Sequence, residues 1–196
     1  QGKELESICK RPERYYWQRQ ETVNGKIRYL ATPRGRLREI LDKLQALLQR
    51  ISLPDCIHGG RKGHSNITNA LIHINKSVVL NLDLKDFFPN LTNQMVYNIF
   101  CKRLGCSPNV SRYLTRLTTL NGSLPQGSPT STILAALITE PLAKRLDNFA
   151  KGHRAGYSQY VDDTSVSGVE YVQNLIPTIK KIIRQEGFKI NNAKTN

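Results

Sequence analysis

The tetrapeptide Tyr160-Val161-Asp162-Asp163 constrains this chain more than any other feature of its sequence. Its two adjacent aspartates lie between short apolar runs with the composition of strands, residues 155–161 and 164–167. A third acid, Asp83, ends residues 78–82, a run typical of a buried strand. Because neighbouring carboxylates repel one another, a fold that gathers them favours a bound divalent cation. The pattern predicts that strand ends bring the three acids together; an acidic hairpin turn is the simpler alternative for Asp162-Asp163.

The charge of the chain favours a polyanionic partner. Lys and Arg number 29 against 15 Asp and Glu, which gives a net charge of +14. Nine basic and two acidic residues lie between Lys10 and Arg38, interleaved with aromatic rings. Basic groups beside aromatic faces suit phosphate contact together with base stacking. The alternatives are a solvated basic surface and aromatic rings that pack within a hairpin.

The cysteines and the hydropathy predict a cytoplasmic protein. Four cysteines occur without a C-x-x-C pair, so reduced, partly buried thiols are expected rather than a zinc site. No segment is apolar and long enough to predict a membrane span. His58 and His64 flank glycines in a basic segment, which we interpret as a loop that contacts nucleic acid or lies on the surface; a metal site is the alternative that we favour less.

Periodicity predicts a mixed α and β chain. Residues 15–20 and 26–31 are expected to form a hairpin around Asn24-Gly25. Helical spacing predicts helices over residues 36–53, 67–74, 92–104, 107–117, 128–149 and 172–184, with a kink at Pro141 and an interruption at Pro177. Thr92, Ser107 and Ser128 are the expected N-terminal caps of three of them. With strands at residues 78–83 and around the aspartate pair, the fold class is α+β, a small antiparallel sheet packed on helices.

Five segments, in this order, resemble the reverse transcriptase family. Residues 69–73 match the N-A-x-x-H element of retron-type enzymes, and residues 83–88, 124–129, 160–163 and 186–195 resemble motifs A, B, C and D of the palm. The resemblance implies a right-hand polymerase, with fingers over residues 1–75 and palm over 76–196, and some fingers elements between 92 and 122. We expect the thumb to lie outside this sequence. The residues after Ser128 depart from the usual motif B, which leaves the retron subtype open.

The resemblance implies a two-metal site for nucleotidyl transfer. Asp83 and Asp162 would bridge two Mg²⁺ ions, for which Mn²⁺ could substitute, with the Leu84 carbonyl as a further ligand and Asp163 in support. Lys194 resembles the motif D lysine, a candidate general acid for the pyrophosphate. For His73 we favour a hydrogen bond within the fold over a catalytic role.

The resemblance also implies a nucleotide site and a nucleic-acid path. The residues expected around the incoming nucleotide are Arg19, Arg28, Asp86, Phe88, Gln126 and Gly127. Phe88 is the expected steric gate, whose ring would clash with a 2′-hydroxyl; core packing is the alternative for Phe87 and Phe88. The residues expected to contact nucleic acid are Arg34, Arg36, Arg61, Lys62 and Tyr160.

The function so implied is RNA-templated DNA synthesis, with an RNA template, a DNA primer and deoxynucleoside triphosphates as partners. One alternative is a polymerase-like RNA-binding module without catalysis. Another is an RNA-directed RNA polymerase or an untemplated nucleotidyl transferase. The sequence leaves the oligomeric state and the cognate RNA open. It also leaves the biological role open, and the alternatives are retron DNA synthesis, antiviral defence against phage, intron mobility and adaptation in an immune array.

Overall fold

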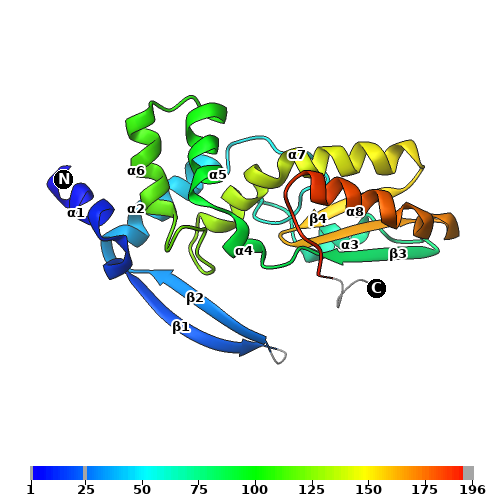
Figure 1. Cartoon of the computed structure of the whole chain (residues 1–196), viewed down its shortest axis with the longest axis horizontal. Coiled ribbons are helices and arrows are strands. Elements are labelled where there is room, and N and C mark those ends of the chain that lie inside the picture. The colour runs from blue at the N-terminus through cyan, green and yellow to red at the C-terminus, as the bar shows by residue number, and fades with distance from the viewer. Residues whose placement is uncertain (1, 24–25, 192–196) are drawn as a thin grey trace. The chain divides into compact units, whose positions relative to one another are not determined.

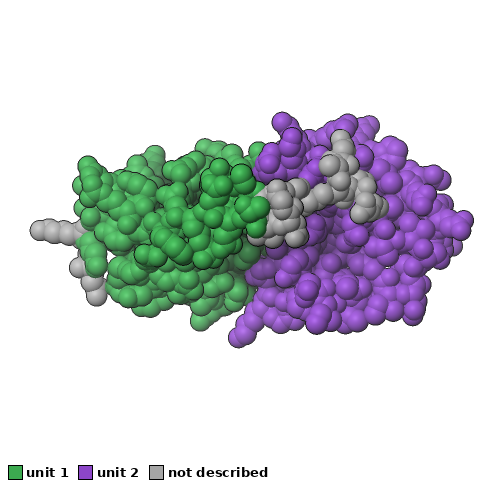
Figure 2. Space-filling view, turned by 90° about the horizontal axis from the view of Figure 1, so that it is seen from below, with its two compact units in different colours: residues 1–51, 88–138 green, residues 52–87, 139–196 purple. Residues whose placement is uncertain are grey.

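The computed structural model describes residues 2–23 and 26–191 and divides the chain into two units. Residues 1–51 and 88–138 make up one unit, and residues 52–87 and 139–196 make up the other (Figure 2). Two helices, α4 (Phe87–Asn90) and α7 (Ser131–Gly152), contribute residues to both units. The expected fingers and palm boundaries stay predictions.

The first unit contains the predicted hairpin. Its strands β1 (Tyr16–Val23) and β2 (Lys26–Pro33) pair antiparallel from Tyr16 opposite Pro33 to Val23 opposite Lys26 (Figure 1). β1 begins one residue later than predicted, and both strands run past their predicted last residues because the antiparallel ladder continues to Val23 and Pro33. The Asn24-Gly25 turn itself lies outside the described residues.

Short helices form the rest of the first unit. They are α1 (Gly2–Lys10), the 3₁₀ turn η1 (Pro12–Tyr15), α2 (Gly35–Leu48), α5 (Asn93–Asn98), the π-helical η2 (Ile99–Arg103) and α6 (Pro108–Thr118). Their core joins Ile8, Leu37, Leu41 and Leu117 to Tyr16 of the hairpin. Burial is the main force that holds these short helices, since isolated helices of this length are marginal in water.

The predicted N-terminal caps Thr92 and Ser107 are confirmed, and the predicted cap Ser128 is wrong. Thr92 accepts a hydrogen bond from the Met95 amide, and Ser107 accepts one from the Val110 amide. The helix expected from Ser128 begins at Ser131 instead. The Ser131 hydroxyl donates to the Pro125 carbonyl at 2.6 Å, which holds the residues before the helix as a turn.

The second unit is built on a three-stranded antiparallel sheet. Its strands β3 (Val78–Asp83), β4 (Gly156–Tyr160) and β5 (Asp163–Gly168) lie in the order β3-β5-β4. Its helical segments are α3 (Asn66–Leu71), the 3₁₀ segment η3 (Glu170–Leu175), α8 (Ile176–Gln185) and the later part of α7; α7 and α8 run beside the sheet (Figure 1). The helical segment predicted over residues 172–184 with an interruption at Pro177 is divided into η3 and α8, and Pro177 lies in the first turn of α8. The predicted α+β class with a small antiparallel sheet is confirmed.

Ile67, Leu71 and Ile74, which recur at helical spacing, are all exposed rather than packed in a core. Among the described residues, no helix combines the length and the apolar character that a membrane crossing requires.

Strand β3 offers a matched test of its packing. We expect Leu82→Ala to lower the free energy of unfolding by about 2–5 kcal/mol, because Leu82 is 1% exposed and its truncation leaves a cavity. Val79→Ala, on the same strand but 40% exposed, is the control and should cost far less. Urea unfolding measures both. Equal losses in the two variants would contradict this view of the core.

Candidate active site

The ends of two strands bring the predicted aspartates together. In the β4–β5 hairpin Tyr160 is opposite Asp163, so Val161 and Asp162 form the turn. Asp83, the last residue of β3, is the cross-strand partner of Asp163. Side chains of directly opposed residues lie on one face of a sheet, with Cβ atoms about 4.5–5.5 Å apart. The Leu84 amide also donates to the Asp162 carbonyl at 3.0 Å, which ties the turn to the end of β3.

Asp83 is the buried member of the group. It is 7% exposed, whereas Asp163 is exposed and Asp162 is half-buried. The Asn191 side-chain amide donates to Oδ2 of Asp83 at 2.9 Å, and the Asn191 backbone amide donates to the Asp83 carbonyl at 2.8 Å. A buried carboxylate needs such donors, because burial without them is costly. Sequence reasoning missed Asn191, whose one signal was its position in the segment that resembles motif D.

The donor chemistry of this corner fits magnesium. The carboxylates of Asp83, Asp162 and Asp163 and the carbonyl of Leu84 are hard oxygen ligands of the kind Mg²⁺ prefers. A cation would also offset the repulsion between the opposed Asp83 and Asp163 carboxylates. Within the described part of the chain, three His, Cys, Asp or Glu side chains do not converge as a metal-holding group. The two-metal assignment therefore stays a prediction.

The two phenylalanines after β3 differ in burial. Phe87 is 4% exposed and belongs to the core, whereas Phe88 is half-buried and keeps surface that a steric gate needs. Asp86, between β3 and α4, is exposed and has a positive φ of 49°, a conformation that aspartate tolerates better than most residues. Its position is that of a turn residue, and its role toward a nucleotide stays a prediction.

The Gln126-Gly127 loop packs on strand β2 within the first unit. The Gln126 carbonyl accepts a hydrogen bond from the Ala31 amide at 2.7 Å. Gly127 has a φ of 106°, and a Cβ placed there would lie 3.3 Å from the Ala31 carbonyl oxygen. Glycine is therefore required by both the backbone conformation and the close approach. The backbone of Gln126 thus has a structural role. Its side chain is half-buried, and the contact of that side chain with a nucleotide stays a prediction.

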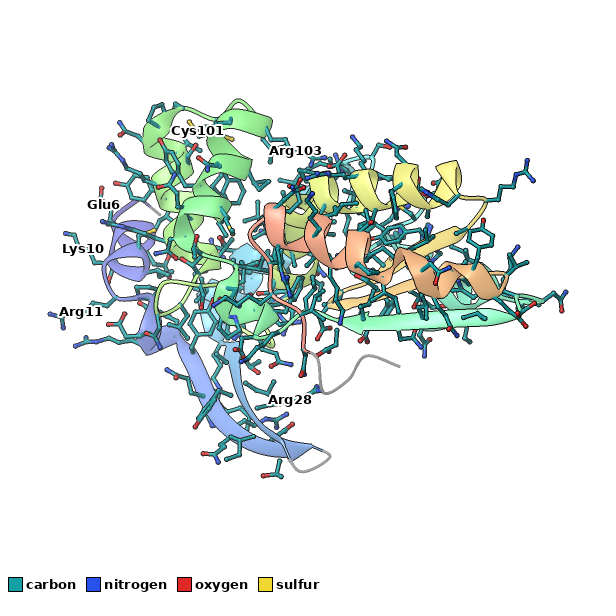
Figure 3. All side chains as sticks on the ribbon, turned by 45° about the vertical axis from the view of Figure 1, so that its right-hand side comes forward. Glu6, Lys10, Arg11, Arg28, Cys101 and Arg103 are labelled. Carbon is teal, nitrogen blue, oxygen red and sulfur yellow. The ribbon has the colours of Figure 1, made fainter. Side chains whose placement is uncertain are left out.

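The hairpin holds a stack of cationic and aromatic side chains. The guanidinium groups of Arg19 and Arg34 lie over the Trp17 ring, 5.0 and 4.8 Å from its centroid. Arg19 also pairs with Glu21 at 2.6 Å. Arg28, opposite Glu21 in the ladder, is exposed on β2 and labelled on the hairpin in Figure 3. Trp17, Arg19 and Arg34 therefore form one cationic and aromatic group at the base of the hairpin, whereas Tyr16 packs in the core, and the contact with nucleic acid stays a prediction.

The other residues predicted to contact nucleic acid differ in their exposure and in their interactions with the protein. Arg36 pairs with Glu39 at 2.5 Å, and Lys62 is exposed. Arg61 donates to the Pro54 and Ile57 carbonyls at 2.9 and 3.3 Å, so it holds its own loop together. Tyr160 is half-buried at the end of β4. Lys194 lies outside the described residues.

Two histidines make hydrogen-bond contacts within the second unit. His73 contacts the Ser167 and Ser158 hydroxyls through its two ring nitrogens, each at 2.7 Å, which confirms the favoured hydrogen-bonded role. His58 is 5% exposed and contacts the Thr68 hydroxyl at 2.9 Å. A surface position for His58 is therefore wrong, because the backbone of residues 56–58 pairs with Gln159 of β4, while the nucleic-acid contact of the rest of this loop stays a prediction.

The cysteines are free, as expected. Cys9 and Cys56 are buried, and Cys101 and Cys106 are half-buried. Burial raises the pKa of the Cys56 thiol to about 11, so this group stays protonated near neutral pH. Burial likewise raises the pKa of the Tyr16 hydroxyl to about 12.

The comparisons with known proteins agree with the motifs. The family described as "Reverse transcriptase (RNA-dependent DNA polymerase)" matches residues 11–196. The chain is 32% identical over 178 residues to the retron Se72 reverse transcriptase of Salmonella heidelberg (strain 579083-10), covering 88% of this chain and 47% of that protein. It is 38% identical over 161 residues to the retron Ec86 reverse transcriptase of Escherichia coli, covering 81% and 48%. The chain thus spans about half the length of the curated relatives it matches.

Solved structures share the fold at low sequence identity. A telomerase from Candida albicans, in complex with a fragment of telomeric RNA, matches with a TM-score of 0.61 and 12% identity, over 92% of this chain and 42% of that one. An apo telomerase from Candida tropicalis matches with a TM-score of 0.61 over 98% and 54%. The fold is that of polymerase fingers and palm. The chain belongs to the reverse transcriptase family, and its similarity is to retron-type members.

Two histidines of the second unit, the buried His58 and the half-buried His73, predict a pH dependence of stability. Burial lowers the pKa of His73 below its ordinary value of 6.5, helped by Lys76, and burial with His64 and Arg61 lowers that of His58. Below pH 6.5 the unfolded chain takes up protons that the folded chain refuses, so the free energy of unfolding falls as the pH falls. Urea unfolding between pH 7.5 and 5.5 measures this slope. We expect His73→Asn to make it shallower, with the exposed His153→Asn as control; an unchanged slope in His73→Asn would contradict the assignment.

Proposed function

We propose that the chain is the fingers and palm of an enzyme that synthesises DNA on an RNA template. The observation that carries the proposal is the placement of Asp83 opposite Asp163, with Asp162 in the adjoining turn, in a chain of the reverse transcriptase family. A binding module needs no such group of carboxylates at the end of a sheet. The retron reverse transcriptases among its relatives support a retron-like subtype.

The residues of the aspartate corner have distinct roles in this proposal. Asp83, Asp162 and the Leu84 carbonyl would hold Mg²⁺, with Asp163 in support. Bound Mg²⁺ would activate the primer 3′-hydroxyl and neutralise the pyrophosphate that leaves. Asn191 fixes the orientation of the Asp83 carboxylate through its 2.9 Å hydrogen bond. Lys194 is proposed to give a proton to the pyrophosphate.

The substrate contacts are assigned to three groups of residues. Arg28, with help from Arg19, is proposed to bind the triphosphate, because exposed guanidinium groups suit phosphate oxygens. Phe88 is proposed to lie under the sugar, while Gln126, Gly127 and Asp86 shape the nucleotide site. Arg34, Arg36, Arg61, Lys62 and Tyr160 are proposed to contact nucleic acid.

Primer extension on an RNA template tests the proposed reaction. The gene product that contains this chain is assayed with deoxynucleotides or ribonucleotides, in Mg²⁺ and in Mn²⁺. We expect deoxynucleotide extension, and a loss of about a hundredfold or more in Asp162→Asn, because an essential negative charge is removed. Asp42→Asn, which removes one exposed carboxylate of α2, is the matched control. Tight RNA binding without extension would favour the non-catalytic module instead.

Phe88→Ala tests the choice of sugar. We expect ribonucleotide use relative to deoxynucleotide use to rise about tenfold or more, because removal of the ring makes room for a 2′-hydroxyl. Phe149→Ala removes another half-buried phenylalanine, in α7, and is the control. The ratio of kcat/KM for the two nucleotide types is the measurement. The same ratio in Phe88→Ala and the unaltered protein would remove Phe88 from the site.

A further inference from the structure

The turn between β4 and β5 has an unfavourable backbone conformation. Val161 has a φ of 58°, in the left-handed region that β-branched residues rarely adopt. Such a conformation persists only where the surroundings impose it. Val161 directly precedes Asp162, so whatever imposes its conformation also sets the direction of the aspartate pair.

Gln159 holds the turn from within the sheet. Its side-chain amide donates to the Val161 carbonyl at 3.0 Å and to the Thr139 hydroxyl of α7 at 2.9 Å. The Tyr157 hydroxyl donates to the side-chain oxygen of Gln159 at 3.4 Å, which fixes the orientation of the Gln159 amide. Gln159 is 1% exposed, so these bonds have no competition from water. The Val161 carbonyl is thereby anchored to a long helix.

Gly59 holds the turn from the outer side of β4. The segment before it pairs with β4: the Gln159 amide donates to the Cys56 carbonyl at 2.7 Å, and the His58 amide donates to the Gln159 carbonyl at 2.8 Å. This pairing brings Gly59 against Val161. A Cβ on Gly59 would lie 2.3 Å from the Val161 backbone nitrogen and 2.8 Å from its Cγ2. Any other residue at position 59 must therefore displace the turn or the segment.

We infer that Gly59 and Gln159 are positioning residues for the aspartate pair. They fix Val161 from two sides, and the hydrogen bond from the Leu84 amide to the Asp162 carbonyl links the turn to the strand that carries Asp83. A displacement of Val161 would change the alignment of Asp162 and Asp163 with Asp83. The expected effect on catalysis rests on the proposed function. The role of Gly59 and Gln159 in fixing the turn at Val161 does not depend on it.

The test compares Gly59→Ala with Gly152→Ala in the gene product that contains this chain. A Cβ on Gly152 would meet nothing within 4 Å, so that variant controls for the added methyl group. We expect Gly59→Ala to lower kcat about tenfold or more, with the Kd for primer–template changed less than about twofold, because small misplacements of reacting groups are costly. We expect Gly152→Ala to retain the unaltered kcat.

Amide hydrogen exchange at Leu84 gives a readout that needs no activity. We expect this amide to exchange about tenfold faster in Gly59→Ala, because its hydrogen bond to the displaced Asp162 carbonyl is weakened. If the protein shows no extension but Leu84 responds, the proposed function fails and the positioning role stands. If extension is present and Gly59→Ala matches Gly152→Ala in both kcat and exchange, the positioning role is overturned.

Two further variants keep the inference testable if Gly59→Ala does not fold. Gln159→Met retains side-chain length but removes the donor to Val161, and we expect a lower kcat and faster Leu84 exchange. Val161→Gly in the Gly59→Ala background removes the Cγ2 contact and the cost of positive φ but leaves the 2.3 Å approach to the backbone nitrogen of residue 161, so we expect kcat to stay well below that of the unaltered protein. An unaltered kcat and exchange rate in Gln159→Met would overturn its role.

Discussion

The antiparallel pairing of β3 with β5 is the interaction on which the candidate site depends. Its register places Asp83 opposite Asp163, and a shift by one residue would send the two carboxylates to opposite faces of the sheet. The buried side chains Leu80, Leu82 and Val166 hold that register, since slippage would expose them to water. The hydrophobic core and the arrangement of the acids are therefore set by the same pairing.

Around this pairing, several hydrogen bonds connect the aspartates to neighbouring segments of the chain. Asn191 donates to the buried Asp83 carboxylate, and the Leu84 amide donates to the carbonyl of the turn. His73 contacts serine hydroxyls of both β4 and β5, so the N-A-x-x-H element acts here as a connection between strands. The motifs that resemble the family thus contribute structural contacts as well as candidate chemistry.

Periodicity and local chemistry in the sequence predicted much of the fold. The hairpin, the strand that ends at Asp83, and the caps at Thr92 and Ser107 all depend on neighbouring residues, and the structure confirms them. Residues such as Gly59, Gln159 and Asn191 could not be recognised this way, because their partners lie far away in the sequence. The same reason explains the error at His58, where pairing with β4 buries a segment whose glycines and charges suggested a surface loop. Motif resemblance predicted Asp83, Asp162 and Asp163 as a group, and the register shows how Asp83 and Asp163 meet.

Trp17 gives the hairpin a built-in optical probe. It is the single tryptophan of the chain, and its ring lies beneath the guanidinium groups of Arg19 and Arg34. Any polyanion that draws these cations away changes the electrostatic environment of the indole, so the tryptophan emission of this chain follows events at the hairpin. Because Arg19 is also held by Glu21, the intensity would report the competition between an internal carboxylate and an arriving phosphate.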